Sequence, residues 1–214
     1  MQPNKTENQR RNFIRSTGIL GAGLLLPNLQ QAAPTPMPLN DNIHEFGKRE
    51  GYTDQVSILV SMMDWMRSVV ERDVRGISQK EIDFLLDDRS NTIGAMLIHL
   101  AGTERYYQID TFTGVPRKEL GYGLSDQEWN AAGNLGAEGR KTFKGRPPSF
   151  YLDTLAEVRA FSLAELKNRG DDWLMESTTF FGGRPTNNYC KWFHVVEHES
   201  NHNGQIRYIK SRVD

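Results

Sequence analysis

Apolar residues recur at helical spacing along four long stretches of this chain, and no stretch shows sustained strand alternation. These stretches predict helices over residues 53–71, 92–107, 150–168 and 188–211. In a chain of 214 residues, such helices bury their apolar stripes most simply against one another. The segment 110–149 is long enough to cross the end of a bundle. We therefore expect an all-α fold, a four-helix bundle with a long crossover connection between helices 2 and 3.

The predicted crossover connection is rich in glycine but does not have the pattern of a nucleotide-binding loop. It contains no phosphate-loop motif and no strand–loop–helix context, which favours a connection that also serves as an active-site lid. Two capping-box patterns, Ser78 to Glu81 before it and Ser125 to Glu128 within it, predict short additional helices.

The composition excludes several classes of protein. The 26 Lys and Arg residues nearly balance the 27 Asp and Glu residues, so no global charge attracts nucleic acid. A hydrophobic content of 37% is typical of a folded globular domain rather than a disordered or multi-span membrane chain. The single cysteine, Cys190, rules out an internal disulfide and a cysteine-based zinc knuckle.

The N-terminal segment, residues 1–33, resembles a twin-arginine export signal. The pair Arg10-Arg11 precedes Phe13 and a short, glycine-containing apolar run over 17–26. That run is too short for a stable membrane anchor, since a bilayer core needs about 20 apolar residues. We expect cleavage near residue 33, a linker over 34–51 and a bundle domain over 52–212. The resemblance implies recognition by the twin-arginine export machinery and a periplasmic or extracellular location.

Four of the five histidines lie in the predicted helices 2 and 4. Residues four apart share one helix face about 6 Å apart, whereas residues eight apart are about 12 Å apart. His198 and His202 follow the apolar stripe of helix 4, so we expect both to point into the bundle. His99 on helix 2 is the natural third member from a facing helix. We place His194 at the rim.

Three neutral imidazoles in one seam favour a divalent metal site over plain core packing. Nitrogen ligands suit Zn, Ni, Fe or Cu, and three protein ligands leave an open position, as in catalytic sites. The stretch from His198 to His202 also matches the H-E-x-x-H motif of metalloproteases. No histidine or glutamate follows His202 to complete a protease site, so we do not favour that function.

Two stretches of the chain resemble the DinB family of metal-binding four-helix bundles, which includes YfiT-like proteins. Residues 91–104 are similar to the family's second helix, and residues 194–206 are similar to its last helix, with Asn203 where arginine is usual. The resemblance implies a metal site at His99, His198 and His202, occupied by Zn or Ni. Members of this family include transferases that join small thiols to electrophiles, so the resemblance implies such an activity. Members also often pair, which implies a homodimer.

Three functions remain open at this point. The first is a metal-dependent thiol transferase acting on a small electrophile. The second is a metal-dependent hydrolase using metal-bound water, with Glu104, Glu197 or Glu199 as candidate proton acceptors. The third is a non-catalytic, exported binder of a metal or a small ligand. Export counts against the first function, because small thiols are scarce outside the cytoplasm.

Several aromatic side chains near the predicted histidine site are candidates for a substrate pocket, although core packing is the more usual role of such residues. They are Tyr106, Tyr107, Trp192 and Phe193.

Overall fold

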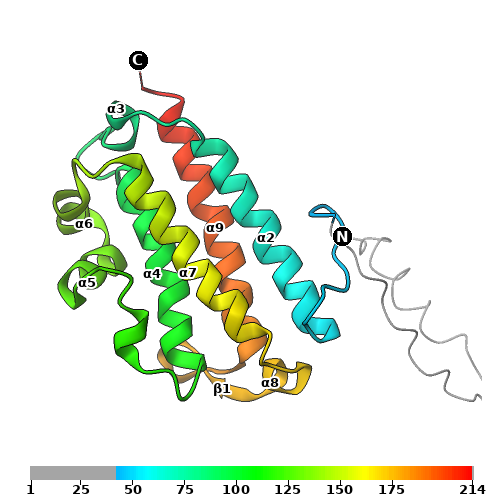
Figure 1. The fold of residues 1–214 in the computed structure, drawn as a ribbon. Coiled ribbons are helices and arrows are strands. Elements are labelled where there is room, and N and C mark those ends of the chain that lie inside the picture. The colour runs from blue at the N-terminus through cyan, green and yellow to red at the C-terminus, as the bar shows by residue number, and fades with distance from the viewer. Residues whose placement is uncertain (1–41, 214) are drawn as a thin grey trace, which may run out of the picture. The chain divides into compact units, whose positions relative to one another are not determined.

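The computed structural model describes residues 42–213 and confirms the predicted four-helix bundle (Figure 1). Residues 1–33, with the predicted export signal, lie outside the described residues. The four long helices of the bundle are α2 (Asp54–Val74), α4 (Ile93–Thr111), α7 (Pro148–Leu166) and α9 (Asn188–Lys210). No helix within residues 42–213 is both long enough and apolar enough to cross a membrane.

Shorter elements connect the long helices. The helical ones are α3 (Gln79–Ile82), η1 (Arg117–Leu120), α5 (Asp126–Asn134), α6 (Gly136–Phe143), α8 (Asp171–Met175) and η2 (Phe181–Gly183). The strands β1 (Ser177–Thr179) and β2 (Pro185–Asn187) form an antiparallel hairpin between α8 and α9. The sequence did not predict this hairpin, because strands of three residues are too short to show a period of two.

Side-chain caps set where several helices begin. Both predicted capping boxes form, one at the start of α3 and one at the start of α5. The hydroxyl of Thr92 accepts a hydrogen bond from the backbone N–H of Ala95 at 3.2 Å and so caps α4. Asn187 caps α9 by accepting from the N–H of Cys190 at 2.9 Å. These caps fix the starting points of the two helices that carry the histidines.

The crossover connection folds into η1, α5 and α6, and these elements pack against α4 (Figure 1). Trp129 and Ala132 of α5 are buried in the core cluster that also includes Leu97 of α4. The indole N–H of Trp129 donates to the carbonyl of Gly121 at 2.9 Å. The connection is thus a packed cover on the outer side of α4.

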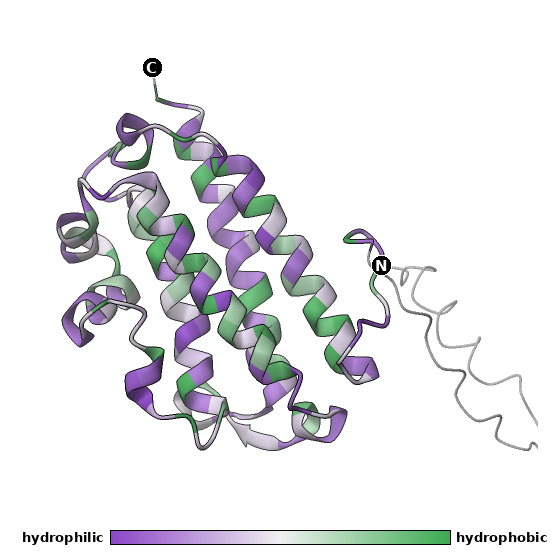
Figure 2. Ribbon diagram, in the orientation of Figure 1, coloured by the Kyte–Doolittle hydropathy of each residue, from purple (hydrophilic) through white to green (hydrophobic). Residues whose placement is uncertain are grey.

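The centre of the bundle contains a buried group of four charged residues, one from each long helix, which we call the charged tetrad. Arg67 of α2 and Arg159 of α7 each contact both Glu104 of α4 and Glu199 of α9, at distances of 2.6–3.1 Å. All four side chains are at most 7% exposed. Figure 2 shows the corresponding hydrophilic stretch in the middle of α9, where a bundle helix would ordinarily be apolar.

Each arginine of the tetrad also bonds to the backbone of a second helix. Arg67 donates to the carbonyl of Leu155 on α7, and Arg159 donates to the carbonyl of Met63 on α2, both at 2.7 Å. Burial alone would raise the pKa of Glu104, but the facing Arg159 and Arg67 hold it below its ordinary value. Glu104 therefore stays ionised, and the tetrad ties the four long helices into one register.

We expect Glu104→Gln to lower the free energy of unfolding by about 3 kcal/mol or more, because it leaves buried arginine charge uncompensated. The matched control is Glu157→Gln, the same change at an exposed position on α7, which should cost less than about 0.5 kcal/mol. Urea denaturation of both variants measures the difference. Similar small losses in the two variants would contradict a stabilising role for the tetrad.

Candidate metal centre

The structure brings His99, His198 and His202 together between α4 and α9. The ring centroids are 4.9 Å apart for His99 and His198, 4.9 Å for His99 and His202, and 4.6 Å for His198 and His202. One nitrogen from each ring lies within 4.8 Å of the others, a spacing that one metal ion could bridge. The three residues that the sequence selected thus form a single cluster, which we call the histidine triad.

A backbone carbonyl of the crossover connection fixes the orientation of His99. Its Nδ1 lies 2.8 Å from the carbonyl oxygen of Ala132 on α5. A carbonyl only accepts, so Nδ1 carries the proton and Nε2 keeps its lone pair. That Nε2 lies 2.8 Å from Nε2 of His198. The arrangement has the form usual for metal-binding histidines, in which the nitrogen away from the metal is held by a carbonyl.

The surroundings of the triad favour neutral imidazoles. Burial lowers the pKa of His198 to about 3 and that of His202 to about 4, and charge repulsion from neighbouring histidines acts in the same direction. Burial also lowers the pKa of His99. Nδ1 of His202 is buried and has no hydrogen-bond partner among the described residues. Neutral, converging and partly unpartnered nitrogens fit a divalent metal ion.

His194 lies one turn before His198, at the edge of the triad. Its Nδ1 is 2.9 Å from the hydroxyl of Tyr107, and its Nε2 is 3.8 Å from the carboxylate of Glu197. His194, Glu197 and His198 form a second group of donor atoms within 4.8 Å of one another. Because Tyr107 engages one ring nitrogen of His194, we interpret His194 as a neighbour of the triad.

The three candidate proton acceptors occupy two different environments. Glu104 and Glu199 belong to the charged tetrad, where arginines occupy three of their four carboxylate oxygens. Oε2 of Glu199 has no hydrogen-bond partner among the described residues. Glu197 is exposed beside His194. The sequence could not separate these carboxylates, because the arginines that bind two of them come from distant positions in the chain.

The four aromatic residues proposed as pocket residues lie in different places. Trp192 is fully buried and donates to the hydroxyl of Thr111 at 3.0 Å, so it belongs to the core. Phe193 is exposed and lies beside Met62 and Tyr189 rather than the triad.

Tyr107 lies against His194, Tyr106 lies against Tyr107, and the hairpin adds two rings that the sequence did not indicate. Tyr107 is buried against His194, and Tyr106 is exposed with its ring 5.8 Å from that of Phe181. The rings of Phe180 and Phe181 lie 5.8 and 6.2 Å from that of His194. We call Tyr106, Phe180 and Phe181 the aromatic flank of the triad. The β1–β2 hairpin, which the sequence pattern did not reveal, places the rings of Phe180 and Phe181 beside His194.

We expect the metal-free protein to lose stability as the pH falls from about 6.5 toward 4. The unfolded histidines take up protons near pH 6.5, whereas His198 and His202 stay neutral in the fold to about pH 3 and 4. The unfolded state therefore binds more protons in this window. Denaturation of chelator-treated protein across the window should give a steeper pH slope for wild type than for His198→Gln. Equal slopes would contradict the burial of neutral imidazoles.

No curated protein matches this chain. A family model described as Mycothiol-S-transferase matches residues 58–214, which span α4, α7 and α9 and include the whole histidine triad. The chain therefore belongs to the mycothiol S-transferase family, a DinB/YfiT-like family of metal-binding helical proteins.

Proposed function

We propose that this protein is a metal-dependent transferase that joins the thiol of mycothiol to a small electrophile. The observation that carries the proposal is the convergence of three neutral histidines within a chain of the mycothiol S-transferase family. His99, His198 and His202 would hold the metal, which we expect to be Zn or Ni. When bound, such an ion supplies a positive charge and an open position that favour the nucleophilic thiolate of a bound thiol.

The protein itself contributes orientation and surroundings. The carbonyl of Ala132 holds the His99 ring, and the charged tetrad holds α4 and α9 in register around the triad. The aromatic flank gives an apolar surface for an electrophile beside the triad. In the transfer, the thiol proton is released, sulfur bonds to the electrophilic carbon, and the leaving group departs with its bonding electrons.

The carboxylates near the triad support a hydrolase less well than the family match supports a transferase. A hydrolase needs a carboxylate or another base free to accept a proton from water. Arginines hold both carboxylate oxygens of Glu104 and one of the two of Glu199, and Glu197 is solvated beside His194. The binding-protein alternative predicts full metal occupancy without any turnover.

Elemental analysis of the purified protein should find about one metal ion per chain, as expected of a single three-ligand site. We expect His99→Ala, His198→Ala and His202→Ala each to abolish this occupancy. His194→Ala is the matched control and should retain the metal, because Tyr107 engages that ring. Equal losses from all four variants would make His194 a further ligand and would contradict the assignment of the triad.

The metal-loaded protein should then accelerate the reaction of mycothiol with an aryl halide, and His198→Ala should lower that rate to background. Hydrolysis of esters at a rate independent of thiol would instead favour the hydrolase. A metal-loaded protein that accelerates neither reaction would favour the non-catalytic binder.

We further propose that residues 1–33 direct export through the twin-arginine machinery, on the basis of Arg10-Arg11 and the apolar run that follows. This route carries folded proteins, so the triad would acquire its metal before export. Arg10→Lys with Arg11→Lys should retain the protein in the cytoplasm, as measured by cell fractionation. An unchanged distribution would refute the export signal and would remove the main objection to a thiol substrate.

A further inference from the structure

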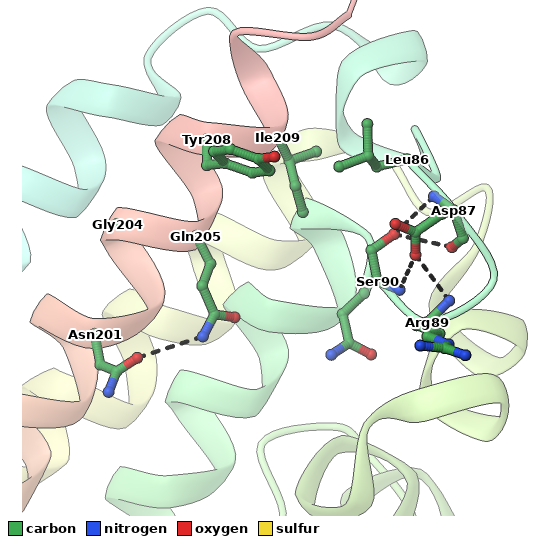
Figure 3. A pocket seen from close by; sticks show the side chains of 10 residues that line it. Leu86, Asp87, Arg89, Ser90, Asn201, Gly204, Gln205, Tyr208 and Ile209 are labelled. Carbon is green, nitrogen blue, oxygen red and sulfur yellow. Dashed lines mark hydrogen bonds between the residues drawn. The ribbon is translucent and has the colours of Figure 1, made fainter.

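A cavity of about 560 Å³ lies between the last turns of α9 and the loop that joins α3 to α4 (Figure 3). Its volume falls in the range of small-molecule sites, about 300–1,000 Å³. From the loop it is lined by Leu86, Asp87, Arg89, Ser90 and Asn91, and from α9 by Asn201, Gly204, Gln205, Tyr208 and Ile209. We call this cavity the polar pocket.

The polar pocket borders the histidine triad through α9. Asn201, which lines the pocket, directly precedes His202 on α9, and Gln205 lies three residues beyond it on the adjacent turn. The amide of Gln205 also donates to the side-chain oxygen of Asn201 at 3.3 Å, as Figure 3 shows. Asn201 is three residues beyond His198, on the adjacent turn of the helix. A ligand in the pocket is therefore next to the His202 side of the triad.

The lining combines side-chain amides with apolar surface from Leu86, Tyr208 and Ile209, a combination that suits a sugar-like molecule with hydroxyl groups and an apolar ring face. Asn91, Asn201 and Gln205 are side-chain amides that can both donate and accept hydrogen bonds. Tyr208 contributes a ring that is 53% exposed, a surface suited to the face of a sugar-like ring. Gly204 leaves room on the α9 side, because a Cβ built there would meet no atom within 4 Å.

The loop side of the polar pocket is held in place by bonds to its own backbone and to α6. Asp87 accepts hydrogen bonds from the N–H groups of Arg89 and Ser90, both at 2.8 Å. Arg140 of α6 donates to the carbonyl of Ser90 at 2.9 Å. Asn91 accepts from the N–H of Gly136 at 2.9 Å. A rim fixed in this way loses little conformational freedom when a ligand binds.

The two sides of the triad along α9 differ in character. Toward the hairpin, the triad borders the aromatic flank through His194. Toward the end of α9, it borders the polar pocket through Asn201 and Gln205, which lie on the turns around His202. A transferase must hold two unlike molecules, an electrophile and a thiol, on either side of its reacting centre. Mycothiol carries its cysteine on a pseudodisaccharide of glucosamine and inositol, which is rich in hydroxyl groups.

We propose that the polar pocket binds the pseudodisaccharide body of the thiol substrate and so presents the cysteinyl sulfur to the triad from the His202 side. This assignment rests on the proposed thiol-transferase function. It makes Asn201, Gln205 and Tyr208 determinants of thiol specificity, whereas the aromatic flank contacts the electrophile.

The test compares mycothiol with N-acetylcysteine, which carries the same thiol without the pseudodisaccharide. Gly204→Met fills the pocket from α9, and Tyr208→Ala removes its aromatic wall without adding bulk. We expect each variant to lower the ratio of kcat/KM for mycothiol to kcat/KM for N-acetylcysteine by about tenfold or more. Arg207→Met, an exposed change on α9 outside the pocket lining, is the control and should leave the ratio unchanged. Metal content is measured for every variant.

A second measurement separates the pocket from the reaction. Calorimetry with glucosaminyl-inositol, which has no thiol, should show binding to wild type and about tenfold weaker binding to both pocket variants. Binding of this kind without thiol transfer would uphold the pocket and refute the proposed function. If both variants still transfer thiol and the ratio of the two kcat/KM values is unchanged, as it is when both thiols lose equally, the assignment of the pocket is wrong. The proposed transferase function then stands.

Discussion

The charged tetrad is the interaction on which the rest of this structure depends. Apolar packing brings four helices together, but it tolerates sliding and rotation of one helix against another. Arg67, Glu104, Arg159 and Glu199 do not tolerate such movement, because each buried charge needs its partners at hydrogen-bond distance. One residue from each long helix is thereby fixed at the same level of the bundle.

This constraint reaches the histidine triad directly through the chain. Glu199 directly follows His198 on α9, and Glu104 lies five residues after His99 on α4. Fixing the two glutamates therefore fixes the rotation and height of both ligand-bearing helices. The tetrad contains two positive and two negative side chains, so it adds no formal net charge beside the triad. Burial and repulsion from neighbouring histidines then keep the imidazoles neutral.

The sequence predicted the four long helices and the pair His198 and His202 from local periodicity, and it supplied His99 as the third member from a facing helix. His198 and His202 lie on the apolar stripe of α9, and that stripe distinguished them from His194. The tetrad could not be predicted in the same way. Arg67 and Glu104 look like solvated helix charges until the fold places them opposite partners from other helices. The carbonyl of Ala132 and the rings of the β1–β2 hairpin depend in the same way on tertiary packing.

The division of roles between tetrad and triad also bears on the kind of metal site that the triad would form. A structural zinc site typically has four protein ligands and holds together a fold that fails without it. Here the bundle has an extensive apolar core and a tetrad that joins all four long helices independently of any metal. The triad offers three ligands and lies between an aromatic flank and a polar pocket. A metal held by the triad would therefore be free to serve chemistry, because the apolar core and the tetrad join the long helices.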